Sequence, residues 1–501
     1  MLRDRYDSDK LFEQISALMP QMDPILAKID TYLEDEGLFA LVWEDLSKRR
    51  PQTLVTGRNS TPVEVILRML VVKRLYGYSY EETERYVKDS LVLRKFCRIY
   101  LNAVPDDTTL IRQANLIQPE TLEKFNARIV ELARAAKMTK GHKLRTDGTV
   151  VESNIHAPSD NRLLADGVRV LARTVERAQA ACQRVAEALG ATFPNLTRVA
   201  KQKARQIGET LRKRSEEAKE AGKTAYRELV EMTQTTVTQA QQALACLATA
   251  TDATAQRLAE TLRTFIPRVE QVIAQTERRI FGNESVPAQE KLVSLFEAHT
   301  DIIVRGKEGH AVEDGHKVWL NEVDGGIVSH YRILDGNPAD SDQWLPSLEA
   351  HQQQLGHSPE QASADRGLYS AYNEQEAKAL GVERVILPKR GYRSAERKQY
   401  EQQEWFIAGC KWHAGVEGRI SVLKRAHGLG RCLNHGQSGF ARWVGWGVIA
   451  GNLAVMGRAG QHTRGGIRLG RYEQTSKWAG AKLGITPAWT GLLSLLHQKL
   501  N

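Results

Sequence analysis

The chain has few of the residues that would point to an oxidising compartment or a membrane. Only five cysteines occur among 501 residues, and none forms a Cys-x-x-Cys pair. Such scattered cysteines are typical of free thiols in a reducing compartment, and their spacing to nearby histidines is too irregular for a structural zinc site. The longest apolar stretch, near residues 445–457, is too short and glycine-rich to span a bilayer, and the charged N-terminus has no signal-peptide core. We therefore expect a cytoplasmic protein that is not a membrane protein and has access to the nucleoid.

An excess of acidic residues is also missing. The chain has 70 lysines and arginines against 60 aspartates and glutamates, a net charge of +10, and 42% of its residues are apolar. A basic balance favours a polyanionic partner, first nucleic acid and then an anionic membrane, although a basic enzyme without such a partner stays open. The length predicts two to four domains with a large buried core.

The N-terminal region, residues 1–135, is predicted to be helical. From residue 61 to 100 apolar residues recur at three- and four-residue steps, as in amphipathic helices. Short helices with tight turns and basic exposed faces resemble a DNA-binding helix-turn-helix module, and a plain helical bundle is the alternative. The expected helix starts are Thr61 as N-cap before Pro62, Ser79 in a capping box with Glu82, and Asp107 or Thr108.

The rest of the chain alternates strands with helices. Residues 140–160 contain the first strands, 161–295 are almost purely helical, and 300–460 return to strands and helices, with a hairpin around Asp324 and Gly325. Residues 461–501 are expected to form a C-terminal tail. The highly charged part of the helical segment predicts either a solvated helical hairpin or a basic arm along DNA. The order of elements predicts an α/β fold with a mixed sheet and a long helical insertion.

Two aspartates lie where the strand patterns make a carboxylate unusual. Asp147 lies inside a strand pattern, where a charge is costly unless it is paired or bound to metal, although Asp-Gly also marks turns. Glu152 is a competing ligand, but alternation along the strand would turn it away from Asp147. Asp365 ends a strand in Ala-Asp-Arg-Gly, whose small residues leave room for a ligand. A helix cap is the alternative role, but the next helix starts several residues later.

The third candidate acid, Glu417, lies on a predicted helix in a basic segment. Residues 389–435 contain ten lysines and arginines and four glutamates. Lys424 is two helical turns beyond Glu417, so both fall on one face and could supply a metal ligand and a phosphate contact. Trp405 and Trp412 could stack on a base or pack internally. Further candidate DNA contacts are Arg419, Lys389 and Arg390.

Four blocks of this sequence together resemble a known family. The blocks are TDGTVVESNIHAPSDNRLLADGVRVL, GHKVWLNE with LDGNPADS, ADRGLYSAYNEQEAKALGVERVILPKRG and WHAGVEGRISVLKRAHGLGRC. They resemble bacterial insertion-sequence transposases of the DDE type, which have a ribonuclease-H-like core, and the ISNCY group is the most similar. The resemblance covers roughly residues 60–170 and 300–457.

The resemblance implies a DNA transposase whose metal-binding and catalytic triad is Asp147, Asp365 and Glu417. It implies two Mg²⁺ or Mn²⁺ ions, cleavage and joining of DNA at the element's terminal inverted repeats, and a homo-oligomer on DNA. Cys410 and His413 stand where the family's tyrosine and arginine are expected. Because 218 positions separate the aspartates and only 52 separate Asp365 from Glu417, the insertion is expected after the first core strand. A nuclease on the same core, or a non-catalytic DNA-binding derivative, are the alternatives.

Overall fold

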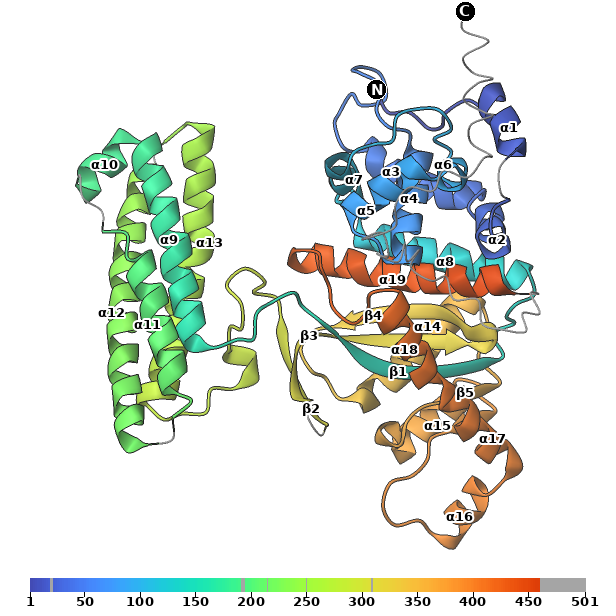
Figure 1. The fold of residues 1–501 in the computed structure, drawn as a ribbon. Helices are drawn as coiled ribbons and strands as arrows, with labels where there is room; N and C mark the ends of the chain where they lie inside the picture. Colours follow the sequence, from blue (N-terminus) through green and yellow to red (C-terminus); the bar gives the residue numbers. More distant parts are fainter. Residues whose placement is uncertain (19–20, 191–193, 214, 249, 308–309, 460–501) are drawn as a thin grey trace, which may run out of the picture. The chain divides into compact units, whose positions relative to one another are not determined.

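The first 135 residues form a helical region. The computed structural model describes residues 1–18, 21–190, 194–213, 215–248, 250–307 and 310–459, and the expected tail at 461–501 lies outside them. The N-terminal helices are α1 (Lys10–Ala17), α2 (Pro24–Tyr32), α3 (Glu36–Ser47), α4 (Val63–Tyr76), α5 (Tyr80–Asp89), α6 (Leu91–Phe96), α7 (Asp107–Ala114) and α8 (Pro119–Ala135), as Figure 1 shows.

One of the expected helix starts is confirmed and two are displaced. Ser79 and Glu82 form the capping box of α5, each side chain accepting from the other residue's backbone N–H. The prediction of Thr61 as a cap is wrong, because Pro62 has an extended ψ of 145° and is itself the cap of α4. Asp106 caps α7, one residue before the expected positions, and its carboxylate accepts from the N–H of Thr109.

The expectation of basic residues on exposed faces is wrong for α4. Arg68, Lys73 and Arg74 are all buried. Arg74 donates to the carbonyl of Trp443 at 2.5 Å and stacks on its ring. Burial, together with the charge of Arg74, lowers the pKa of Lys73 to about 7. The lysine and arginine stems of α4 therefore pack inside the protein.

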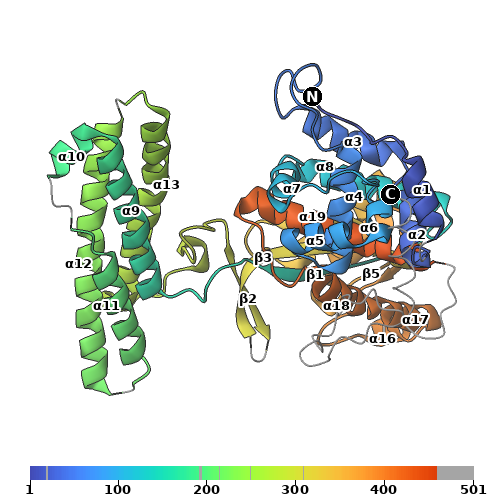
Figure 2. The ribbon, with the colours of Figure 1, turned by 45° about the horizontal axis from the view of Figure 1, so that its top comes forward.

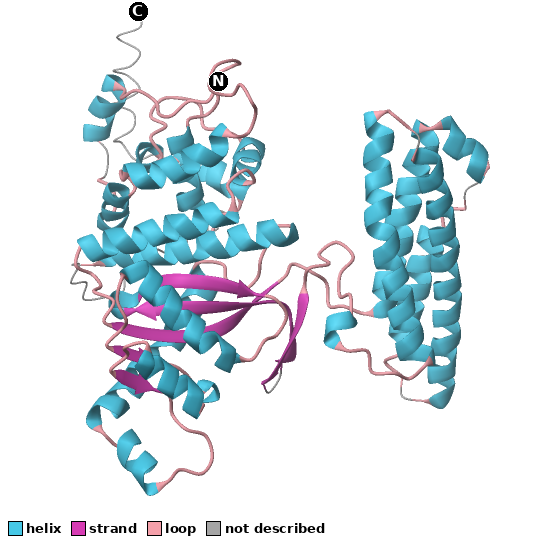
Figure 3. Cartoon of the chain, turned by 180° about the vertical axis from the view of Figure 1, so that it is seen from behind, coloured by secondary structure: helices cyan, strands magenta, loops and turns pink. Residues whose placement is uncertain are grey.

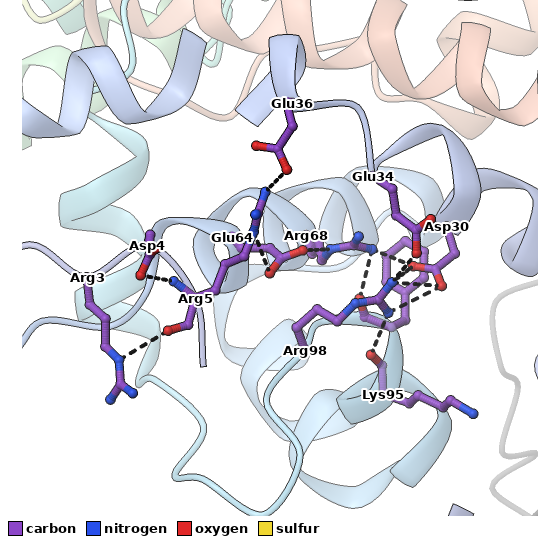
Figure 4. Close-up of polar contacts among 11 residues, drawn as sticks. Arg3, Asp4, Arg5, Asp30, Glu34, Glu36, Glu64, Arg68, Lys95 and Arg98 are labelled. Atoms are coloured by element: carbon purple, nitrogen blue, oxygen red, sulfur yellow. Dashed lines mark hydrogen bonds and ion pairs between the residues drawn. The ribbon is translucent and has the colours of Figure 1, made fainter. Parts of the chain in front are cut away.

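Arg68 shows how such a buried cation is accommodated. Its guanidinium is fully buried and lies 2.5 Å from Asp30 and 3.1 Å from Glu64, and it also donates to the carbonyl of Phe96 (Figure 4). Arg98 joins the same carboxylate of Asp30 at 3.1 Å. A buried charge needs such partners, so these residues hold α2, α4 and the segment after α6 together.

A mixed sheet follows the helical region. The strands are β1 (Lys143–Glu152), β2 (Asp301–Lys307), β3 (His310–Val323), β4 (Ile327–Leu334), β5 (Gln361–Ser363) and β6 (Arg384–Ile386). β1 pairs antiparallel with β3 and parallel with β5, which pairs parallel with β6; β3 also pairs antiparallel with β2 and β4. The β3–β4 hairpin turns at Gly325 and Gly326, whose φ angles are 80° and 75°, as expected for a turn at this point.

Helices cover both faces of the sheet. The helices are α14 (Trp344–Leu355), α15 (Ala371–Ala379), α16 (Ala395–Glu401), α17 (Glu404–His413), α18 (Gly415–Ala426) and α19 (Gly436–Arg458). α8 and α19 lie side by side and both contact β4 (Figures 1 and 3). On their face of the sheet, Val151 and Leu320 share an apolar core with Leu423 and Val444. On the other face, Trp319 donates to Ser347 of α14 at 2.9 Å.

The helical insertion lies between β1 and β2, as expected. It contains α9 (Asp160–Ala181), α10 (Gln183–Leu189), α11 (Thr197–Thr210), α12 (Glu216–Leu247) and α13 (Ala253–Thr276). Its long helices run side by side (Figure 2) around an apolar core of their own, which includes Leu171, Leu229 and Leu262. The predicted mixed α/β fold with an N-terminal helical region and a long helical insertion is therefore confirmed. In the described ranges, no helix is long and apolar enough to cross a membrane.

Candidate active site

The three candidate acids, far apart in the sequence, line one cavity of about 590 Å³. Asp147 comes from β1, Asp365 follows β5, and Glu417 lies in the first turn of α18. Parallel pairing of β1 with β5 brings the two aspartates to the same part of the sheet. The other residues that line the cavity are Ala364, Arg366, Ile386, Pro388, Arg393, Lys398, Glu401, Gln402, Phe406, Ile407, Cys410, Lys411, His413, Ala414 and Val416.

Asp147 is a half-buried acid in the middle of β1. It pairs in register with Leu320, so alternation turns it to the sheet face whose core contains Leu320 and Leu423. One oxygen accepts from the N–H of Gly148 at 2.7 Å. Burial first, and then the negative charge of Asp365, raise the pKa of Asp147 to about 6. This carboxyl is thus short of positive partners.

Asp365 has the opposite electrostatic environment. Its side chain is 70% exposed, and Oδ1 lies 3.3 Å from Nε2 of His413. This contact, aided by the charges of Arg366 and Arg390, holds the pKa of Asp365 below its ordinary value. The other ring nitrogen of His413, Nδ1, is buried and has no hydrogen-bond partner within the described ranges. The cavity therefore contains one readily ionised carboxylate beside one that resists ionisation.

Glu417 is exposed on α18, and a nearby ion cluster fixes this helix to the sheet. Glu322 of β3, whose side chain is 1% exposed, accepts from Arg145 of β1 at 2.9 and 2.7 Å. Its Oε1 also lies 3.4 Å from Nε of Arg419 on α18. Arg145 further donates to the carbonyl of Trp412 and lies 4.8 Å from the centre of its ring. Arg145 and Arg419 each lie two residues from a candidate acid, so this cluster sets how β1 and α18 approach each other.

A glycine makes that approach possible. Gly415 begins α18, and a Cβ atom there would collide with Nη1 of Arg145. Gly418, three residues later, has nothing within 4 Å of an added Cβ. The close contact at Gly415 is therefore specific to the side of the helix that meets the sheet.

The chemistry of the acids suits a hard divalent cation. Carboxylate oxygens are the ligands that Mg²⁺ and Mn²⁺ prefer, and a cation would favour the charged form of Asp147, whose pKa is raised by burial and by the charge of Asp365. In the part of the chain that the structure describes, however, no three histidine, cysteine, aspartate or glutamate side chains already form a metal-binding group. The two aspartates interact electrostatically, and Glu417 lies on the wall of the same cavity.

The comparisons with known proteins bear on the N-terminal helices. Residues 13–115 match the family model of a transposase domain, DUF772. This match supports a transposase family, a class of DNA-cleaving and therefore DNA-binding enzymes. No curated protein and no solved structure matches the chain significantly. The transposase domain ends before β1, so the function of the cavity rests on its own geometry.

The structure gives the candidate DNA-contacting residues different environments. Arg419 is largely buried in its ion pair with Glu322, which favours a positioning role. Arg390 is exposed, Lys389 is half-buried with its ammonium near the ring of Tyr369, and Lys424 is half-buried on α18. All four stay predictions as DNA contacts.

Sequence reasoning did not identify several cations of the cavity. These are Arg366, Arg393, Lys398 and Lys411. Arg366 directly follows Asp365, and that adjacency was a usable signal; the others come together only through the fold. Trp412 packs against Arg145, and Trp405 contacts Tyr400 and Phe406, which favours internal packing for both.

Proposed function

We propose that this protein is an insertion-sequence DNA transposase of the DDE type. Asp147, Asp365 and Glu417 are its catalytic residues, and the β4–β3–β1–β5–β6 sheet is a ribonuclease-H-like core. The observation that carries the proposal is the cavity: three acids separated by 218 and 52 positions line the same 590 Å³ space. The antiparallel hairpin beside β1 and the parallel strands on its other edge support it, as does the transposase domain at residues 13–115.

The acids would hold two Mg²⁺ or Mn²⁺ ions. Such ions activate an attacking oxygen and stabilise the leaving oxygen of a phosphodiester. Asp147 and Asp365 form the fixed part of the site, since each lies on or beside a paired strand. Glu417 is exposed, so its side chain is free to turn toward the aspartates and complete the ligand set. His413 orients Asp365 through their 3.3 Å contact.

The cations around the acids would hold the DNA. Arg366, Arg393, Lys398 and Lys411 line the cavity and suit contacts to phosphate oxygens. Phosphate contacts fix the position of the strand without reading its sequence, so recognition of the element's ends belongs to other surfaces. Because transposition joins two DNA ends, we expect two or more copies to assemble on DNA.

Replacing either aspartate tests the proposal. Asp365→Asn and Asp147→Asn should each reduce Mg²⁺-dependent cleavage of DNA carrying the element's ends by at least ~10³-fold, because a lost ligand removes charge that binds the metal. DNA affinity should stay within about twofold, since neither acid contacts phosphate directly. Cleavage and strand-transfer products are resolved on denaturing gels, and affinity is measured by fluorescence anisotropy.

Glu152→Gln is the matched control. Glu152 lies on the same strand but pairs with Arg431 at 2.9 Å and does not line the cavity, so its replacement should keep full activity. Full activity in Asp365→Asn would refute the proposal. Cleavage without any strand-transfer product would assign the cavity to a nuclease instead.

A further inference from the structure

A second, larger cavity lies on the helical insertion. It is an open groove of about 1090 Å³. One side is the face of α9 that carries Arg162, Asp166 and Arg169, and another is a face of α11. The chain segments 154–159 and 293–297, which enter and leave the insertion, and His435 complete the lining of the groove.

The α11 side of the groove is a stripe with three cations. Lys201, Arg205 and Gly208 of α11 recur at steps of four and three residues, which is the spacing of one helix face, and Arg212 follows just after the helix ends at Thr210. The three cations are all exposed. At 1.5 Å per residue the helical part of the stripe, from Lys201 to Gly208, is about 10 Å long, roughly three base-pair steps at 3.4 Å each. Such a length exceeds what a single small anion requires.

Every acid that lines the groove is already paired. Asp166 accepts from Arg169 at 2.7 Å, Glu209 from Arg205 at 2.9 Å, and Glu297 lies 2.9 Å from Nε2 of His299. Within the described ranges, three other cations that line the groove, Arg162, Lys201 and Arg212, form no ion pair with an acidic residue.

The outer face of the neighbouring helix α12 differs. There Lys219 lies 2.5 Å from Glu216 and Lys223 lies 3.0 Å from Glu220. Local pairs of this kind are the ordinary arrangement of a solvated helix surface. Charge on the insertion is thus balanced on α12 and unbalanced in the groove.

We propose that this groove binds the backbone of duplex DNA, using Arg162, Lys201 and Arg212 as phosphate contacts. The inference rests on the proposed function, which makes DNA the polyanion that this protein must hold. It adds a second DNA-contacting surface, on the insertion, which is separate from the cavity of the three acids. The groove carries no information on sequence, because contacts to phosphate position DNA without specifying it.

The test is a triple variant of the full-length protein, Arg162→Ala with Lys201→Ala and Arg212→Ala. Its affinity for a fluorescein-labelled random-sequence DNA duplex is measured by anisotropy at several salt concentrations. Each lost phosphate contact removes about 0.9 from the slope of log K against log salt. The slope should therefore become shallower by roughly 2 to 3, and affinity at low salt should fall on the order of 100-fold.

The matched control is Lys219→Ala with Lys223→Ala and Arg263→Ala, which removes three exposed cations from the same insertion but outside the groove. This control should keep the wild-type slope. An unchanged slope in the groove variant, or an equal change in both variants, overturns the inference. Failure of the proposed function gives a different result. Normal DNA cleavage by Asp365→Asn would refute the proposed active site, whereas the salt slopes of the groove and control variants would still test whether the groove binds DNA.

Discussion

At the scale of single residues, Asp147 is the most informative position. Its carboxyl is half-buried, accepts a hydrogen bond from the backbone N–H of Gly148, and lies near a second aspartate. Proteins seldom keep an acid in such a place for stability, because the charged form is both desolvated and repelled. Strongly perturbed groups in a cavity are candidates for function. The raised pKa of Asp147, at about 6, therefore agrees with a role in binding a cation.

This environment predicts that Asp147→Asn stabilises the metal-free protein. The folded-state pKa of about 6 lies above the ordinary value, so ionisation of Asp147 opposes folding as pH rises toward 6 and beyond. At about pH 7.5 the variant should gain roughly 1–3 kcal/mol in free energy of unfolding. The gain should shrink as the pH falls through about 6 and vanish below about 3, where the carboxyl is protonated in both states. Urea unfolding without divalent cations measures both.

Asp365→Asn provides the comparison for this effect. Removing the neighbouring charge takes away one of the causes that raise the pKa of Asp147. In that background the gain from Asp147→Asn should become smaller. A loss of stability on replacing Asp147 at about pH 7.5 would contradict the electrostatic account.

Residue-level predictions from the sequence succeeded where the signal was local. Asp147 and Asp365 stood out because each interrupts or ends a strand pattern. The shared partner of Arg145 and Arg419 could not be predicted from the sequence, because Glu322 lies 177 residues from Arg145 and 97 residues from Arg419. The same limit explains α4: its basic residues suit an exposed face by sequence, but Trp443 of α19 lies against Lys73 and Arg74, and Asp30 of α2 pairs with Arg68. The roles of these arginines and lysines depend on long-range contacts, which the local spacing of residues in the sequence does not indicate.

At the scale of elements, the approach of α18 to β1 decides where Glu417 lies. Gly415→Ala should disturb it, because the new methyl group would displace the guanidinium of Arg145 from Glu322 and Trp412. We expect a stability loss of about 1–3 kcal/mol from this overpacking. The rate of DNA cleavage should fall about 10- to 100-fold, as small displacements of a catalytic group do. Thermal unfolding and single-turnover cleavage measure the two effects.

Gly418→Ala is the control on the same helix. An added Cβ meets nothing within 4 Å there, so the variant should keep its activity and gain up to ~1 kcal/mol from better helix propensity. Equal behaviour of the two alanine variants would show that the Arg145 contact does not position α18.

Elements were predicted better by type than by detail. The hairpin β3–β4, the helices after it and the insertion after β1 follow from strand alternation, helical spacing and the order of segments. The predicted helix starts near Thr61 and Asp107 were wrong by one or two residues: Pro62 caps α4 through its backbone conformation alone, and at α7 the adjacent Asp106 is the cap. Such differences depend on backbone angles that residue type alone does not determine.

At the scale of the whole molecule, the chain has separate apolar cores. The highly charged part of the insertion was expected to be a solvated helical hairpin or a basic arm, since it has few large apolar residues. It has a core nonetheless, because alanines such as Ala200, Ala204 and Ala240 are buried and let the helices pack closely. The buried residues of this core in the described ranges lie between 163 and 295, whereas the core beneath α19 combines residues of β1, β3 and β4 with residues of α18 and α19. Sequence periodicity indicated the helices, but not that small side chains would join them.

Separate cores predict that the insertion unfolds as a unit of its own. Leu171 of α9 and Leu348 of α14 are both fully buried. Leu171→Ala should lower the stability of the insertion by about 2–5 kcal/mol, and Leu348→Ala should lower that of the sheet region by a similar amount. In calorimetry of the full chain each variant should therefore displace a different transition, because a domain with its own core unfolds cooperatively by itself. A single transition that both variants shift equally would instead mean that the insertion and the sheet fold as one unit.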